Sequence, residues 1–306
     1  MFDMNTEAAT DQAIVLAMSE IRGVCRPIEL AQVLDEIRTS PSAEIGEVHD
    51  GPAGGTLDEL FAKVTPERVT YWERELSRLG NAGVTVTTVC DESYPINLRM
   101  VFNRPAYLFA SGRVVDADQY AVAVVGTRKP SDFGLRIATD VAAGLAAEGV
   151  TVVSGLALGI DIAAHASALN SGGRTIAVLG SGIEKVSPAG HRSVANRIAA
   201  DERGAVVSQF PPSTPPQRWT FPLRNVVTSG LSAATVVIEA GPTSGARLQA
   251  ENCLQHGKKL LLVEKLVMQQ PWAREMVDRP GVAVVSDVGE IIDFAVAETA
   301  VPVEIG

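Results

Sequence analysis

The amino-acid sequence predicts an α/β protein in which a doubly wound, mostly parallel sheet follows a small all-helical N-terminal domain. The first observation behind this prediction is a series of short apolar segments between residues 84 and 285, with helical stretches between them. Continuous apolar strands are typical of a parallel sheet that helices bury on both faces. The second is that the chain begins with helix-like apolar spacing and no such strands. Since 306 residues exceed one ordinary domain, we place the two domains at 1–80 and 81–306.

The N-terminal domain is predicted from helical spacing and from its breaks. Gly23 and Pro27 interrupt the apolar periodicity, and a segment rich in Pro, Gly, Ser and acidic residues at about 40–55 indicates a linker. The predicted helices cover residues 14–21, 28–37, 57–64 and 66–79.

The second domain is predicted from strands that alternate with helices. The predicted strands are 84–89, 122–125, 150–153, 175–179, 205–207, 235–238, 260–263 and 282–285. The main predicted helices are 135–147, 162–169, 247–255 and 288–296. Ligands of this architecture bind at the carboxyl ends of the strands, so the loops that follow the strands are the candidate site.

The charge of the chain is unevenly distributed. The net charge is −10, yet residues 121–263 carry 13 Lys and Arg against 9 Asp and Glu, between two acidic flanks. The local field decides which partner binds, so this basic segment permits a polyanion. No apolar run approaches the roughly 20 residues of a membrane span, and the N-terminus has no secretory pattern. The three widely spaced cysteines indicate reduced thiols, so we expect a cytoplasmic protein without metal or cofactor.

The first candidate loop leads from a strand into a helix with Gly126, Thr127, Arg128 and Lys129. Backbone amides at a helix N-terminus favour an anion, and the two cations add to this. The alternative is an ordinary strand-to-helix turn with surface cations. We favour the anion site.

The second loop contains Ser154, Gly155 and Gly159 and opens the next helix. Its glycines permit close backbone approach to a phosphate. Asp161 and His165 lie four residues apart on one helical face. They could form an acid–base or metal pair, but we favour a structural or ligand-positioning role, with no catalytic residue in the chain. The spacing departs from the dinucleotide fingerprint G-x-G-x-x-G, so NAD binding has little support.

Lys185, in the loop after the predicted strand 175–179, could reach a phosphate or be an ordinary loop lysine. Arg224 and Asn225 supply planar donors suited to phosphates or base edges. We assign Phe221 to the core and leave Trp219 open between core and base stacking.

A further candidate loop joins a strand end, marked by Glu239, to a helix that Ser244 or Thr243 can cap. Ser244 and Gly245 are candidate phosphate ligands there, and Glu239 is a structural or positioning residue. We expect five such loops at successive strand ends to form one continuous rim.

Together these segments resemble the DNA-processing protein A (DprA/Smf) family. The motifs are G-T-R at 126–128, S-G-L-A-L-G-I-D at 154–161, F-P-L-R-N at 221–225 and V-I-E-A at 237–240. The resemblance implies an extended Rossmann-like domain that binds single-stranded DNA, forms a homodimer and loads a RecA-type recombinase onto incoming DNA during natural transformation. The chain departs from the family pattern at Val226, where many relatives have a second arginine.

Two other classes of function remain open. The glycine-rich rim could hold a mononucleotide, as in a nucleotide sensor or a nucleotide-processing protein, although the chain lacks the P-G-G-x-G-T-x-x-E motif of the phosphoribohydrolases with a related topology. A protein-binding adaptor would instead use the acidic helical domain as its contact surface.

Overall fold

The computed structural model describes residues 4–21, 27–39, 52–200 and 203–299. The chain divides into two compact units, the first formed by residues 1–94 with 102–109 and the second by 95–101 with 110–306. The predicted domain boundary at 80 and 81 stays a prediction. Of the predicted linker, residues 40–51 lie outside the described residues and 52–55 belong to a helix.

The first unit contains the helices that the sequence predicts and one strand. Its elements are α1 (Met4–Ser19), α2 (Pro27–Thr39), α3 (Pro52–Lys63), α4 (Pro66–Asn81) and β1 (Val84–Thr88). Thr65 caps α4 by accepting a hydrogen bond from the Arg68 amide, and Pro66 occupies the first helical position, where its missing N–H has no partner to lose. Gln12 of α1 donates to the Val86 carbonyl at 3.3 Å and so connects the helices to the strand.

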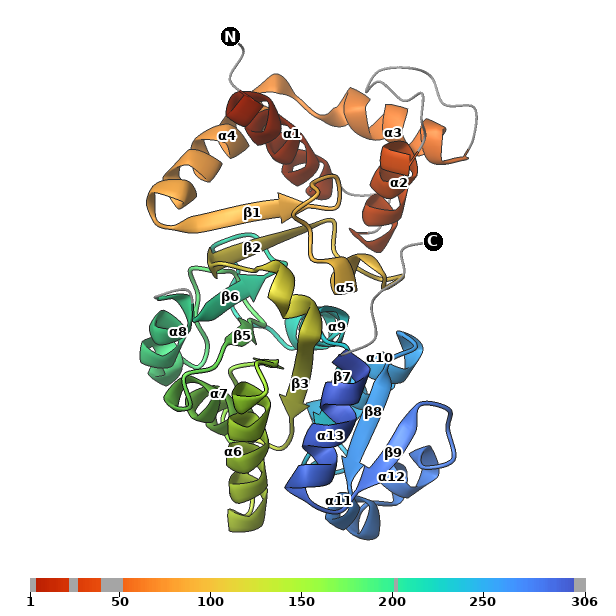
Figure 1. The fold of residues 1–306 in the computed structure, drawn as a ribbon. Coiled ribbons are helices and arrows are strands. Elements are labelled where there is room, and N and C mark those ends of the chain that lie inside the picture. Colours follow the sequence, from red (N-terminus) through yellow and green to blue (C-terminus); the bar gives the residue numbers. More distant parts are fainter. Residues whose placement is uncertain (1–3, 22–26, 40–51, 201–202, 300–306) are drawn as a thin grey trace. The chain divides into compact units, whose positions relative to one another are not determined.

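Seven parallel strands form the sheet of the second unit, in the order β6-β5-β4-β3-β7-β8-β9 (Figure 1). They are β3 (Ala121–Val125), β4 (Thr151–Ser154), β5 (Thr175–Val178), β6 (Gly204–Ser208), β7 (Ala234–Val237), β8 (Lys259–Val263) and β9 (Val282–Val285). Strand β2 (Tyr107–Gly112) runs from the first unit into the second. The predicted doubly wound, mostly parallel α/β fold is confirmed.

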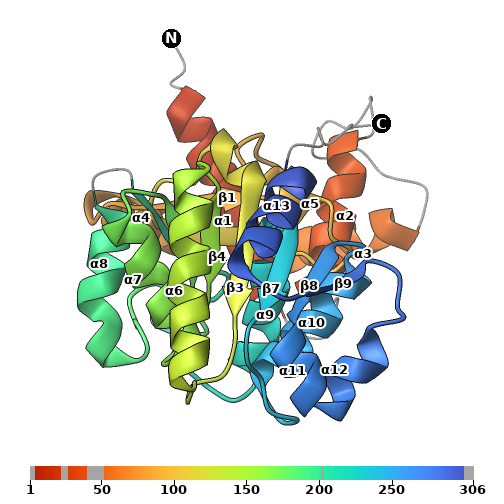
Figure 2. The ribbon, with the colours of Figure 1, turned by 60° about the horizontal axis from the view of Figure 1, so that its bottom comes forward.

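The helices of the second unit cover both faces of its sheet (Figure 2). They are α5 (Ile96–Arg99), α6 (Asp132–Ala147), α7 (Ile160–Asn170), α8 (Arg192–Ala199), α9 (Thr220–Leu231), α10 (Gly245–Gln255), α11 (Glu264–Gln269), α12 (Pro271–Met276) and α13 (Val288–Thr299), with short 3₁₀ turns η1 (Asp116–Tyr120) and η2 (Ala189–His191). On one face α6, α7 and α13 bury Val122, Val124 and Val236. The alternate residues of β3 are also buried, which explains why the strand is apolar throughout.

Helix α9 differs from the sequence prediction, which treated residues 221–225 as a strand-end loop. These residues form its first turns, and Pro222 is tolerated there because the first amides of a helix need no intrahelical partner. At the other end Lys258 donates to the Ser229 and Gly230 carbonyls at 2.9 and 2.7 Å, so it caps the helix with a cation. Along the described residues, no helix combines the length and the apolar character needed to cross a membrane.

Candidate functional site

A pocket of about 540 Å³ opens at the carboxyl ends of the central strands. It lies beside β3, whose neighbours β4 and β7 carry the chain to opposite sides of the sheet. This is the topological switch point, where open parallel sheets bind their ligands. The polar and charged lining residues are Thr127, Arg128, Lys129, Asp161, Arg224, Asn225, Thr228, Thr243, Ser244 and Gln249.

The loop after β3 contacts the loop after β4 beside the pocket. The Ile160 amide donates to the Thr127 carbonyl at 3.2 Å. A Cβ on Gly126 would lie 2.5 Å from the Ile160 side chain, and one on Gly159, whose φ is +82°, would lie 2.4 Å from the Thr127 carbonyl. These glycines therefore permit close approach between two loops of the protein, which is a different use from the phosphate contact that the sequence suggested.

Glu239 holds the N-terminus of α6. Its carboxylate accepts hydrogen bonds from the Ser131 amide at 2.9 Å and the Ser131 hydroxyl at 2.5 Å. A carboxylate at this place satisfies free amides and the positive end of the helix dipole. The anion site predicted at the start of α6 is thus occupied by the protein's own side chain.

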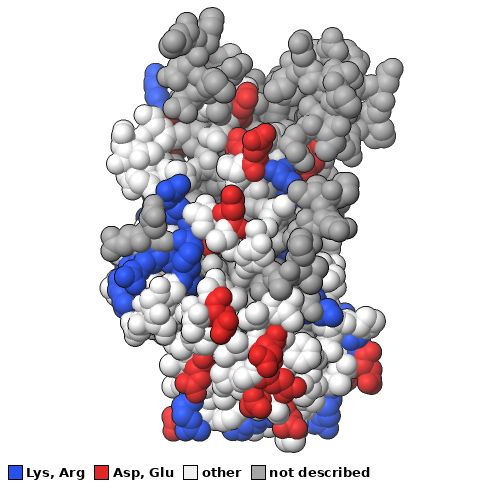
Figure 3. All heavy atoms as spheres, in the orientation of Figure 1, with Lys and Arg blue, Asp and Glu red and all other residues white. Residues whose placement is uncertain are grey.

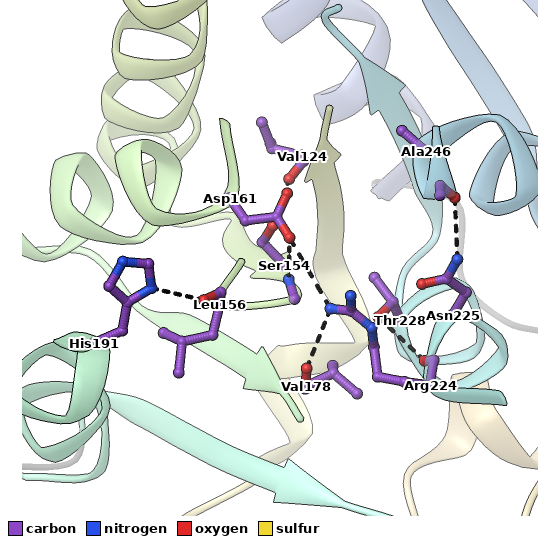
Figure 4. A network of polar contacts seen from close by, with 12 residues as sticks. Val124, Ser154, Leu156, Asp161, Val178, His191, Arg224, Asn225, Thr228 and Ala246 are labelled. Atoms are coloured by element: carbon purple, nitrogen blue, oxygen red, sulfur yellow. Dashed lines mark hydrogen bonds and ion pairs between the residues drawn. The ribbon is translucent and has the colours of Figure 1, made fainter. Parts of the chain in front are cut away.

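Arg224 extends from α9 towards Asp161, as Figure 4 shows, and both side chains line the pocket. Its Nη1 donates to the Val178 carbonyl at 3.3 Å and lies 4.0 Å from Oδ2 of Asp161. The guanidinium packs directly on Gly155, where a Cβ would lie 1.2 Å from Nη1. Its Nε has no hydrogen-bond partner in the described structure although it is buried, which leaves one donor at the pocket floor unsatisfied.

Asp161 is the only Asp or Glu among the residues that line the pocket. It accepts a hydrogen bond from the Gly155 amide at 3.2 Å. Burial raises the pKa of its carboxyl, and Arg224 opposes that shift. Burial likewise lowers the pKa of the Arg224 guanidinium, an effect that Asp161 opposes and the nearby Arg128 adds to. The pocket thus holds a partly compensated buried cation and two exposed cations, Arg128 and Lys129.

His165 does not act together with Asp161. It is fully buried, and its Nδ1 lies 2.7 Å from the Thr175 hydroxyl, which itself donates to the Val152 carbonyl at 2.6 Å. Burial lowers the pKa of the imidazole to about 3, so the ring is neutral at physiological pH. His165 therefore lies in the core, bonded to a neighbouring strand residue.

Two sets of contacts shape the remaining walls. Asn225 donates to the Gly245 carbonyl at 3.1 Å, and the Gln249 amide is placed to donate to the Asn225 carbonyl at 3.0 Å. The Arg128 guanidinium lies over the Phe221 ring, 5.3 Å from its centre. Phe221 is half-buried and lines the pocket, so its assignment to the core was wrong.

The N-terminus of α10 faces the pocket through Ser244 and Gly245. Ser244 caps this helix by accepting a hydrogen bond from the Ala246 amide at 3.2 Å, which is the capping that the sequence predicted. Unlike α6, this helix has no acidic residue in its first turn.

Four of the phosphate-binding candidates do not line the pocket, namely Ser154, Gly155, Gly159 and Lys185. Ser154 is buried and donates to the Val124 carbonyl at 2.7 Å, Gly155 lies under Arg224, and Lys185 is exposed on the loop after β5. Trp219 is 51% exposed and packs edge-on against Phe210 outside the pocket. Sequence reasoning missed Gln249 and Thr228, which follow Ser244 and Arg224 by about one helical turn and could have been found from that spacing. Within the described ranges no group of three His, Cys, Asp or Glu side chains could hold a metal ion.

Comparison with known proteins identifies relatives of this chain. The family described as DNA recombination-mediator protein A matches residues 85–295. The DNA processing protein DprA of Bacillus subtilis is 31% identical over 213 residues, which are 68% of this chain and 71% of that protein. Protein Smf of Synechocystis is 34% identical over 80% of this chain and 62% of its own length. Protein Smf of Escherichia coli is 39% identical over 55% of this chain, and the matched part is 45% of its length.

Solved structures share the fold. DNA processing protein A from Streptococcus pneumoniae superposes with a TM-score of 0.70 at 24% identity, covering 93% of this chain and 97% of that one. The protein of the same name from Helicobacter pylori gives a TM-score of 0.61 at 23% identity, covering 70% of this chain and 96% of that one. Because the family match spans most of the second unit and the pocket residues within it, the chain belongs to the DNA recombination-mediator protein A (DprA/Smf) family.

Proposed function

We propose that this chain binds single-stranded DNA in the strand-end pocket and acts in recombination without catalysing a reaction. The observation that carries the proposal is the convergence of Arg128, Lys129 and Arg224 on one pocket that contains a single acidic residue, Asp161. Lys and Arg contacts to phosphates supply most of the affinity of sequence-independent binding. The chain has a net charge of −10, so such binding requires a local concentration of cations of this kind.

The polar residues fit a positioning role better than catalysis. His165 bonds to Thr175 in the core and Asp161 to the Gly155 amide, so the two do not form an acid–base pair. The amides at the start of α10 can bind a phosphate beside the three cations. Trp219, which is exposed, offers a ring on which a base can stack outside the pocket.

Family membership supports the choice of ligand. DNA processing protein A from Helicobacter pylori, which shares this fold, has a single-stranded DNA binding mode described as unique. By relation to this family, the proposed role includes homodimerisation and the transfer of bound DNA to a RecA-type recombinase in natural transformation. We further propose that the protein acts in the cytoplasm, where such DNA and recombinase meet.

The test is a fluorescence-anisotropy titration of labelled single-stranded and double-stranded DNA at several salt concentrations. We expect tighter binding of the single strand, weakening as salt rises. The double variant Arg128→Ala with Lys129→Ala should lower the slope of log affinity against log salt by about 1.4, because each phosphate contact to a single strand contributes about 0.7. Lys259→Ala with Arg279→Ala, at the amino ends of β8 and β9, removes the same charge far from the pocket and should leave binding unchanged. Equal slopes for the two double variants would refute the assignment.

A mononucleotide is the second candidate ligand, because the volume of the site suits it. A pocket of about 540 Å³ falls in the size range of small-molecule sites. Analysis of nucleotides released from the purified protein on denaturation separates the two proposals. A stoichiometric nucleotide, together with weak DNA binding that is insensitive to Arg128→Ala, would favour the sensor.

A further inference from the structure

A second group of cations lies on the same unit, away from the pocket. It consists of Arg113, Arg174, Arg197 and Arg203, which we call the arginine cluster. Arg113, Arg197 and Arg203 are exposed, and Arg174 is half-buried. Figure 3 shows Lys and Arg side chains gathered over the part of this unit where α8 and the start of β6 lie.

Backbone contacts hold the cluster together. The Arg113 amide donates to the Gly204 carbonyl at 3.1 Å, which places Arg113 beside Arg203. Arg174 donates from Nη2 to the Arg113 carbonyl at 2.9 Å. A Cβ on Gly112 would lie 3.0 Å from Cα of Ala199, so the end of α8 lies against the same segment.

Side-chain contacts place the fourth member. Arg197 of α8 donates from Nη2 to Oδ1 of Asn170 at 3.0 Å, at the end of α7. Four residues further along the chain, Arg174 stands directly before β5. One helix and three connecting segments thus bring cations that are distant in sequence to one surface.

Among the described residues, Asp116 and Asp118 supply negative charge near the four arginines. Asp118 is buried and pairs with Arg174 at 3.0 Å, while it also accepts a hydrogen bond from Thr151. Asp116 is exposed, and Asp201 and Glu202, which precede Arg203 in the sequence, lie outside the described residues. Arg174 is therefore the member with a buried counter-charge, and it serves mainly to fix the Arg113 segment.

The cluster and the pocket lie at opposite ends of the parallel strands. Arg174 and Arg203 precede β5 and β6, at the amino ends of these parallel strands, whereas the pocket lies at the carboxyl ends. Strands β5 and β6 have 4 and 5 residues, so their two ends lie about 13–17 Å apart. This exceeds the Debye length of about 8 Å at physiological salt, so the two basic surfaces act independently on charged ligands.

We propose that the arginine cluster binds the backbone phosphates of a second segment of nucleic acid while the pocket holds the first. This inference rests on the proposed function of the pocket. Guanidinium groups recognise phosphate through paired N–H donors, and three of the four cations are exposed. The cluster therefore contacts the backbone without reading sequence. With both surfaces in use, one chain holds two DNA segments, one at the amino ends and one at the carboxyl ends of its parallel strands.

The test counts bound oligonucleotides per chain by native mass spectrometry. The probe is oligodeoxythymidylate of about six nucleotides, within the range of single binding sites. The cluster is disrupted by Arg197→Glu with Arg203→Glu, and by Arg197→Gln with Arg203→Gln should the first variant fold poorly. The matched control is Lys259→Glu with Arg279→Glu, which makes the same change in net charge. These residues lie at the amino ends of β8 and β9, which are at the other end of the strand order from β5 and β6.

We expect two oligonucleotides per chain for the unmodified protein and for the control, and one for the cluster variants. Arg128→Ala with Lys129→Ala should also retain one, bound at the cluster. A single oligonucleotide on the unmodified protein, or two on the cluster variants, would overturn the proposal. If Arg128→Ala with Lys129→Ala still binds two oligonucleotides per chain while the cluster variants bind fewer, the proposed function of the pocket is refuted and binding at the arginine cluster is supported.

Discussion

The buried pair of Asp161 and Arg224 allows a quantitative test of how the pocket floor is held together. The two charged atoms lie 4.0 Å apart, and both side chains are about nine-tenths buried. At an effective dielectric constant of about 20, two unit charges at this distance interact by about 4 kcal/mol. We expect Arg224→Met to lower the free energy of unfolding by about 3–5 kcal/mol, because it leaves the Asp161 carboxylate buried without its counter-charge.

A double-mutant cycle isolates this interaction. Asp161→Asn keeps an oxygen that can accept a hydrogen bond from the Gly155 amide. The double variant Asp161→Asn with Arg224→Met removes both charges. Urea denaturation followed by circular dichroism should give a coupling energy of about 2–4 kcal/mol. If the two single changes add within about 0.5 kcal/mol, the pair contributes nothing and the reasoning is refuted.

The pH dependence supplies an independent check on the same pair. Because the folded pKa of Asp161 is already raised by burial, the loss of Arg224 raises it further. A carboxyl whose folded pKa exceeds its unfolded value takes up protons more readily in the folded state, so stability falls as pH rises towards the folded pKa. The deficit of Arg224→Met should therefore shrink as pH is lowered from neutrality towards the unfolded pKa of about 4, whereas Asp161→Asn with Arg224→Met should show no such recovery.

Three further changes probe the surroundings of the pocket. Gly155→Ala should lower the unfolding free energy by about 1–3 kcal/mol and weaken DNA binding, because the added Cβ would displace the Arg224 guanidinium. The control in urea denaturation is Gly190→Ala, whose added Cβ would meet no other atom within 4 Å. Glu239→Gln should lower the unfolding free energy by about 0.3–1 kcal/mol and tighten DNA binding in the anisotropy assay, because it removes an anion from the start of α6; weaker binding would contradict this. For His165, a folded pKa of about 3 lies below the usual value of about 6.5, so the unfolded chain alone gains a proton and stability falls as pH drops from about 6.5 towards 3. His165→Asn should flatten that part of the pH profile of urea midpoints, and an unchanged slope would show that other groups cause it.

The strands could be predicted because their burial leaves a local signal. Both faces of the central strands are covered, so β3 is apolar throughout and β4 has two valines at its centre, and the loops between the strands carry glycine and polar residues. The positions of the strand-end loops followed from chain order alone. For the same reason the sequence correctly placed Arg128, Lys129 and Ser244 at one edge of the sheet.

Helix α9 could not be predicted in the same way. Val226, Val227 and Gly230 are poor helix formers, and a proline lies near its start. Tertiary contacts stabilise it instead: Lys258 caps its last carbonyls, and nearly all its residues after Leu223 are buried. Because these partners are distant in sequence, the helix and the inward direction of Arg224 appear only once the sheet has formed.

The glycines show what a local motif leaves open. A glycine indicates that something approaches the backbone closely, but Gly126, Gly155 and Gly159 are approached by Ile160, Arg224 and Thr127 of the same chain. Glu239 likewise takes the helix N-terminus that a phosphate could have used. The positive field of the pocket therefore comes mainly from charged side chains and from the start of α10, rather than from all the strand-end amides. Side-chain cations release counterions when they meet phosphates, so the salt dependence of binding should follow the number of intact cations more closely than it follows changes in the glycines.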